Sequence, residues 1–77
     1  MIITYDREVD ALYIELRQVK AKDSVDIEEG VTVDLDDDGH IVGVEILDAS
    51  ERLGKDQLHS VTLKDLAWEP ALAGGQE

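Results

Sequence analysis

Apolar and polar residues alternate through most of the first 47 residues, and this period of two limits the fold more than any other feature of the chain. Such runs form strands because successive side chains on a strand point to opposite faces of the sheet. Clusters of Asp, Glu, Lys, Ser and Gly separate the runs, as turns require. The pattern therefore predicts five short strands, at about residues 2–5, 11–16, 24–27, 31–35 and 40–47.

Strands with short links pair in antiparallel fashion, and one face of the resulting sheet would be a stripe of Val, Ile and Leu that needs a cover. Two segments predict helix: a single turn with Ser50 as N-cap and Gly54 at its end, and a longer helix over residues 62–70. We therefore predict an α+β fold, an antiparallel β-meander of about five strands with one short C-terminal helix packed on one face. A single domain would cover residues 1–70, and residues 71–77 would be a disordered tail.

The chain has 77 residues, no cysteine and a net charge of −12, from 19 acidic and seven basic side chains. This charge excludes nucleic-acid binding, which depends on Lys and Arg, and it repels anionic membranes. No apolar run reaches the ~20 residues that span a bilayer, and no signal peptide precedes the first strand, so we expect a cytoplasmic protein. A domain this small without disulfides needs a metal or self-association, which predicts a homo-oligomer. A basic protein is a second partner that the charge allows.

The segment VDLDDDGHIVGVE has the spacing of an EF-hand calcium loop, with Asp34, Asp36, Asp38 and Glu45 as ligands and Gly39 at the sharp turn. An EF-hand needs helices on both sides of its loop, whereas the flanks here predict strands. Glu45 would then lie ~20 Å along its strand from the turn, too far to share one ion. We favour a hairpin turn, with the calcium site disfavoured and weak cation binding by the aspartates left open.

Polar side chains also gather around the first predicted hairpin: Tyr5, Asp6, Asp10 and Tyr13. They are the candidate binding residues, and Asp6 and Asp10 could form an acid–base pair if their environments separated their pKa values. The interpretation that we favour has Asp6 begin the turn and Asp10 close it through hydrogen bonds to the backbone. No catalytic residue and no cofactor is predicted. The two histidines, His40 and His59, have no convergent partners in the spacing.

The segments ITYDREVDALYIEL and GVTVDLDDDGHIVGVEILDAS, within residues 2–50, resemble the domain of unknown function 2283 family of small bacterial and archaeal proteins. The resemblance implies a small β-rich domain of unassigned role and brings no catalytic residues. In that family the Asp-Gly run looks like a turn between strands. The chain departs from the family from Glu51 onward. The elements that carry the resemblance are Tyr5-Asp6, the block Asp10 to Tyr13, Val33-Asp34, Asp38-Gly39 and the run Gly43 to Leu47.

Three functions follow as hypotheses. The leading one is a non-catalytic, small acidic domain that acts through protein–protein association, as a homo-oligomer or as an antitoxin-like cover for the basic active site of a small ribonuclease-type toxin. The alternative is a small metal-assisted hydrolase or isomerase that uses Asp6, Asp10 or Glu45 at a site between subunits. The third, a calcium-binding loop at residues 34–45, is disfavoured.

Overall fold

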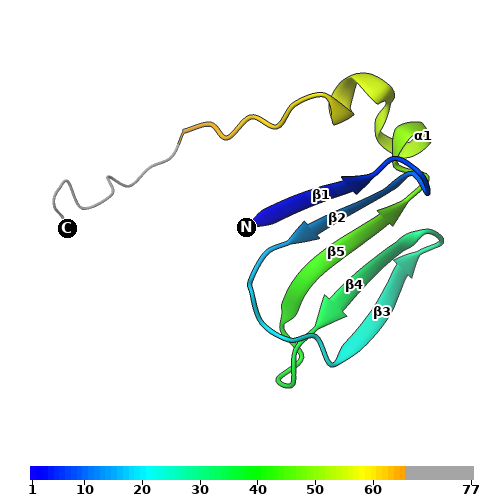
Figure 1. Cartoon of the computed structure of the whole chain (residues 1–77). Helices are drawn as coiled ribbons and strands as arrows, with labels where there is room; N and C mark the ends of the chain where they lie inside the picture. Colours follow the sequence, from blue (N-terminus) through cyan, green and yellow to red (C-terminus); the bar gives the residue numbers. More distant parts are fainter. Residues whose placement is uncertain (66–77) are drawn as a thin grey trace, which may run out of the picture.

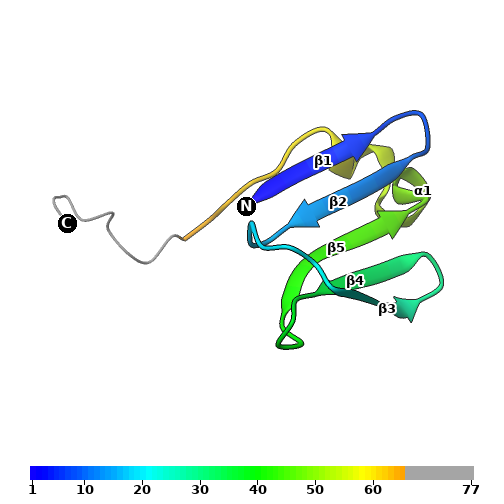
Figure 2. The same cartoon turned by 60° about the horizontal axis from the view of Figure 1, so that its bottom comes forward.

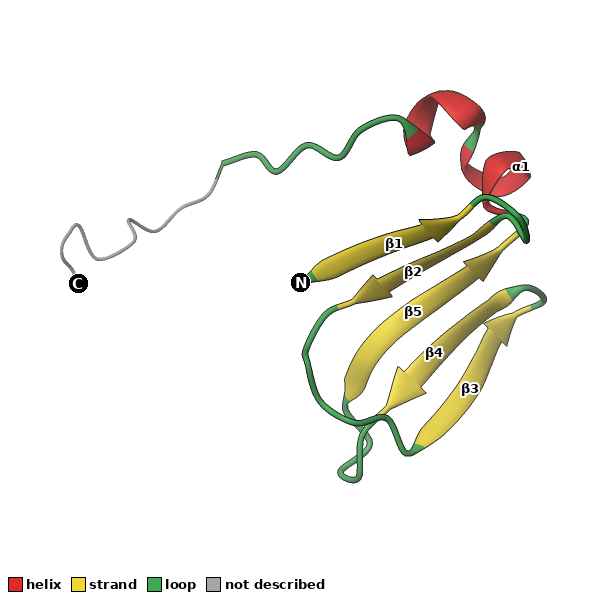
Figure 3. Cartoon of the chain, viewed as in Figure 1, coloured by secondary structure: helices red, strands yellow, loops and turns green. Residues whose placement is uncertain are grey.

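The computed structural model describes residues 1–65, which form one five-stranded antiparallel sheet with a short helix and a 3₁₀ turn at one end (Figures 1 and 3). This confirms the predicted α+β fold, and each predicted strand is correct to within one residue at either end. The elements are β1 (Ile2–Asp6), β2 (Ala11–Glu15), β3 (Asp23–Glu28), β4 (Val31–Leu35), β5 (Ile41–Leu47), α1 (Ala49–Leu53) and η1 (Lys55–Leu58).

The strand order across the sheet is β1-β2-β5-β4-β3, so the hairpin β1–β2 joins the meander β3–β4–β5 through the pairing of β2 with β5. The link over residues 16–22 crosses the end of the sheet to reach β3 (Figure 1). Seven residues can span ~23 Å, and the crossing covers three strand spacings, ~14 Å. The crossing places β5, which is the longest strand, at the centre of the sheet.

The register separates the side chains into two contrasting faces, because paired residues lie on the same side of a sheet. We call one the apolar face: Ile3, Tyr5, Leu12, Ile14, Val25, Val31, Val33, Val44 and Ile46. The other, the acidic face, includes five carboxylates among smaller polar and apolar groups: Asp6, Glu15, Asp26, Asp34 and Glu45.

The apolar face is covered in part within residues 1–65: of the side chains that define it, Ile3 and Val25 are exposed, Val33 is buried and the others are half-buried. Both α1 and η1 lie beyond the ends of the strands (Figures 1 and 2). Leu53 and Leu58 reach the part of the face over β1 and β2, where they line a groove with Ile3, Tyr5, Leu12 and Ile14. At the other edge Val25 is 45% exposed. In the described residues the buried apolar side chains are Val33, Val42 and Ala49.

The short helix begins at Ala49, with Asp48 at the N-cap position in the left-handed region (φ 52°), so the prediction of Ser50 as N-cap is wrong. Gly54 ends the helix as predicted, with φ 87°. Of the helix predicted over residues 62–70, residues 62–65 have no regular structure, and the rest lies outside the described residues, as does the predicted tail at 71–77. Within residues 1–65, no helix has the length and apolar character needed to cross a membrane.

Candidate functional site

Asp10 is the centre of a polar cluster that ties the first hairpin to α1. Its Oδ1 accepts hydrogen bonds from the Tyr5 hydroxyl at 2.6 Å and from the Ser50 backbone N–H at 3.0 Å. Its Oδ2 accepts the Ser50 hydroxyl at 2.7 Å, and its backbone carbonyl accepts the N–H of Ala49 at 3.0 Å. Asp10 has φ 57°, a conformation that Asp tolerates better than most residues.

The electrostatics of this cluster suit an anchor better than an acid–base centre. The Tyr5 hydroxyl, followed by Ser50, lowers the pKa of Asp10, although burial works against the shift. The same carboxylate raises the pKa of Tyr5. A carboxylate with a lowered pKa is a weak base, and a phenol with a raised pKa is a weak acid. His59 lines a groove together with Asp10 and Ser50. The Ser50 hydroxyl donates its hydrogen bond to Asp10, so Ser50 and His59 do not form a nucleophile–base pair.

Of the four residues predicted around the first hairpin, the structure brings Tyr5 and Asp10 together and places the other two elsewhere. Asp6 accepts the backbone N–H of Glu8 at 2.9 Å and begins the turn as predicted. Tyr13 lies on the acidic face, whereas Tyr5 lies on the apolar face. Sequence reasoning missed Ser50 as a partner of Asp10, because 40 residues separate the two and no local spacing signals the contact.

Tyr13 crosses the acidic face above Gly43 and donates its hydroxyl to Asp34 in β4 at 2.9 Å. Asp34 also accepts the Ser24 hydroxyl at 2.7 Å, so this contact spans β2, β4 and β3. Burial, and after it the Asp34 carboxylate, raises the pKa of Tyr13 to about 12. A side chain at position 43 would collide with the ring, so glycine is the residue that fits there.

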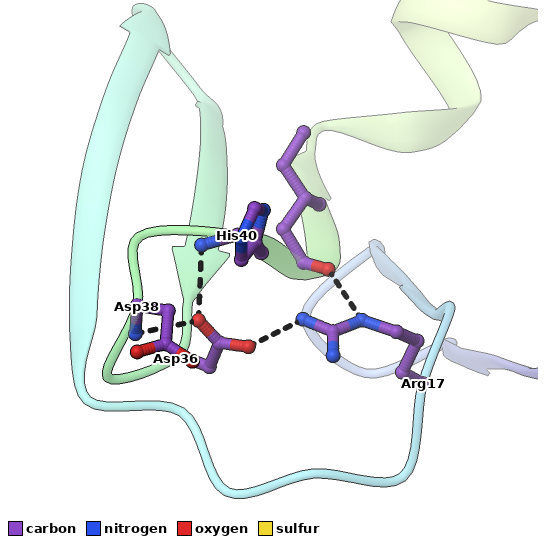
Figure 4. Close-up of polar contacts among 5 residues, drawn as sticks. Arg17, Asp36, Asp38 and His40 are labelled. Atoms are coloured by element: carbon purple, nitrogen blue, oxygen red, sulfur yellow. Dashed lines mark hydrogen bonds and ion pairs between the residues drawn. The ribbon is translucent and has the colours of Figure 1, made fainter.

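The acidic turn between β4 and β5 is organised by one carboxylate, that of Asp36 (Figure 4). Its Oδ1 accepts the backbone N–H groups of Asp38 and His40, both at 2.9 Å, and its Oδ2 forms a 2.7 Å ion pair with Arg17. Arg17 also donates its Nε to the carbonyl of Ile41 at 3.1 Å. The Arg17 guanidinium, followed by the His40 N–H, lowers the pKa of Asp36 to about 2. The predicted hairpin turn is confirmed by this geometry.

The four carboxylates of the calcium-loop spacing do not converge. Asp34 binds Tyr13 and Ser24, while Asp36 binds Arg17 and the turn backbone. Glu45 pairs with Thr32 along the sheet. Among residues 1–65, no three His, Cys, Asp or Glu side chains are grouped so that they could hold a metal ion.

The apolar face remains as the candidate site, and it would act as a contact surface. Its open part lies over β3, β4 and β5, where Val25, Val33 and Val44 are neighbours across the strands. Contiguous exposed apolar patches larger than a few hundred Å² mark interaction surfaces, and the largest apolar patch of a monomer is often functional. The ion pairs found in residues 1–65 are Arg17–Asp36, Lys22–Asp37 and Arg52–Glu28, and the last of these lies at the edge of the open part, where Glu28 is the register partner of Val31.

Comparisons with known proteins find relatives whose function is not assigned. The model of a family described as a protein of unknown function (DUF2283) matches residues 2–50. An uncharacterized protein of Methanocaldococcus jannaschii is 36% identical over 55 residues, which are 71% of this chain and 47% of that protein. The chain thus spans about half the length of the curated relative it matches. No solved structure matches the chain significantly.

Proposed function

The chain belongs to the domain of unknown function 2283 family, and we propose that it acts by associating with another protein surface through its apolar face. One observation carries the proposal: within residues 1–65 the sheet is a single layer, and on the apolar side of β3, β4 and β5 Val25 is 45% exposed while Val31, Val44 and Ile46 are half-buried. A sheet with one apolar face needs a second layer to remove that face from water.

The area of the open part indicates how much a covering partner would stabilise the protein. Three strands about 4.8 Å apart and five residues long, at about 3.4 Å per residue, make a surface of ~250 Å². At ~25 cal/mol per Å², covering it contributes ~6 kcal/mol before the costs of association. Small domains have a total stability of ~5–15 kcal/mol, so a partner on this face would contribute on the same scale as the fold itself.

The free edge at β3 supports the face as the contact surface. This strand carries three acidic residues, Asp23, Asp26 and Glu28, and its pairing with β4 shifts register between the last two. Charged side chains and bulges on an edge strand oppose its pairing with further strands. Association through the face therefore fits the charge pattern better than extension of the sheet.

A pull-down from the native organism tests the proposal with a matched pair of variants. Ile2 and Ile3 are neighbours in β1 with similar exposure, 46% and 39%, and they lie on opposite faces. Ile3→Lys should lose any stoichiometric partner that the tagged wild-type chain retains, and Ile2→Lys should keep it. Equal recovery with both variants would contradict the role of the apolar face.

Two narrower functions stay predictions. The antitoxin-like version would use the acidic face, where Glu15 and Glu45 lie on either side of Tyr13. It predicts that the double change Glu15→Gln, Glu45→Gln slows association with a basic protein, measured as the rate of binding at low salt. The metal-assisted enzyme would use Asp6, Asp10 or Glu45, and of these the Asp10 carboxylate already accepts hydrogen bonds from Tyr5 and Ser50.

A further inference from the structure

We infer that the occupant of the apolar face is a second copy of this chain, packed face to face about a two-fold axis into a two-layer sandwich. The inference rests on the proposed function and names its partner. In a two-fold arrangement the same patch serves both subunits. The open part over β3, β4 and β5 in one copy would then cover the open part in the other.

The placement of charge makes this self-association feasible for a chain with a net charge of −12. Five carboxylates of the sheet lie on the acidic face, on the side away from the contact. The register places Asp23 and Glu28 at the β3 edge of the apolar face, where Glu28 forms an ion pair with Arg52. Packed sheets lie ~10 Å apart, so the two outward faces would be separated by ~20 Å. The Debye length is ~8 Å at physiological salt, so repulsion across that distance is largely screened.

The chemistry of the open part is self-complementary. Its register pairs join Val25 with Val33, Val33 with Val44, and Val31 with Ile46. These side chains carry no charge and no hydrogen-bonding group, so a partner need supply only an apolar surface of similar relief. A second copy of the chain carries such a surface. Two twisted sheets of this kind pack with their strands ~30° apart and interdigitate their side chains.

The available area sets the strength of the dimer. All five strands make a face of ~400 Å², so two copies bring together ~800 Å² before side-chain relief is counted. Stable specific interfaces bury ~1,600 Å² in total, and weak or transient ones fall below ~1,200 Å². We therefore expect a reversible dimer that dissociates in the micromolar range.

Sedimentation of the full chain over about 1 to 300 μM tests the inference with two exposed apolar positions on opposite faces. Val25 is 45% exposed on the apolar face, and Leu47 is 42% exposed on the acidic face. The wild-type chain should shift from its monomer mass of 8.5 kDa to twice that mass as concentration rises. Val25→Lys should remain monomeric throughout, and Leu47→Lys, with the same change in charge, should dimerise as the wild type does.

Circular dichroism controls for folding, and Val25→Thr supplies a second variant that keeps the branched shape. It should weaken the dimer several-fold without a buried charge. A wild-type chain that stays monomeric over the whole range would overturn the inference. If the Ile3→Lys variant still lost a different partner in the pull-down, the proposed function would stand with another occupant. Equal dimerisation of Val25→Lys and Leu47→Lys would also overturn the inference of a face-to-face dimer.

Discussion

At the scale of a residue, the contacts of Asp36 show why the segment with calcium-loop spacing forms a hairpin turn. The calcium-loop spacing counts four acidic residues as equivalent ligands, but the fold gives Asp34, Asp36 and Glu45 different neighbours. Asp36 accepts two backbone N–H groups and pairs with Arg17, so its oxygens already have donors. Arg17 comes from the link that crosses the sheet, and the contact therefore fastens that link to the turn between β4 and β5.

The lowered pKa of Asp36, about 2 against an ordinary 3.8, gives a pH-dependent prediction. The unfolded chain binds the proton more readily, so this stabilisation is complete well above pH 3.8 and is lost as the pH falls through about 2. Between pH 5 and pH 2, Asp36→Asn should therefore show a smaller loss of thermal midpoint than the wild type. Asp38→Asn is the control, because the Asp38 backbone N–H, and not its carboxylate, bonds to Asp36. Parallel curves for the wild type and Asp36→Asn would contradict the assignment.

Gly43 provides a second test at the residue scale. A Cβ at this position would lie 2.6 Å from Cζ of Tyr13 and 2.9 Å from the carbonyl oxygen of Ile14. Gly43→Ala should therefore displace the Tyr13 ring, break its bond to Asp34 and destabilise the fold by about 1–3 kcal/mol in urea unfolding. In a Tyr13→Ala background the same change should cost less, because the two positions are coupled. Additive effects would mean that the ring does not cross Gly43.

The sequence predicts the elements of this fold well and their order less well. Alternation located all five strands, because each must place its apolar residues on the same face. It did not reveal that β2 pairs with β5, since a seven-residue link is long enough either to return or to cross. The register shift between Asp34 and Leu35 was likewise invisible, because one extra residue in β5 leaves the pattern of apolar residues intact. The Asp10–Ser50 contact depends on that order and could not be predicted.

The attachment of α1 gives a prediction at the scale of an element. Five residues are too few for a stable isolated helix, so α1 depends on its tertiary contacts. Asp10→Asn keeps the backbone conformation but removes the charge that holds Ser50, and it should lower the thermal midpoint by several degrees. The ¹³Cα shifts of residues 49–53 should move toward random-coil values. Asp6→Asn, in the same hairpin, should leave them unchanged, and a similar response in both variants would contradict the anchoring role.

On the scale of the whole molecule, the fold consists of one layer with two unlike sides. The short chain has no cysteine, and three apolar side chains are buried in its described residues. Small domains of this kind depend on additional stabilisation, and here the apolar face provides a place for it. The acidic face keeps the opposite side solvated. The association that we propose would follow from how the sequence distributes its apolar and acidic residues over the two faces.

The most direct test of this account compares the exposure of matched methyl groups in the full-length protein. Val25 and Leu47 are almost equally exposed in the single chain, 45% and 42%, and lie on opposite faces. A water-soluble spin label, added while methyl NMR signals are recorded at high protein concentration, broadens methyls that water can reach. The account predicts that Leu47 broadens strongly while Val25 is protected, and that protection disappears on dilution. Equal broadening of the two residues at every concentration would contradict it.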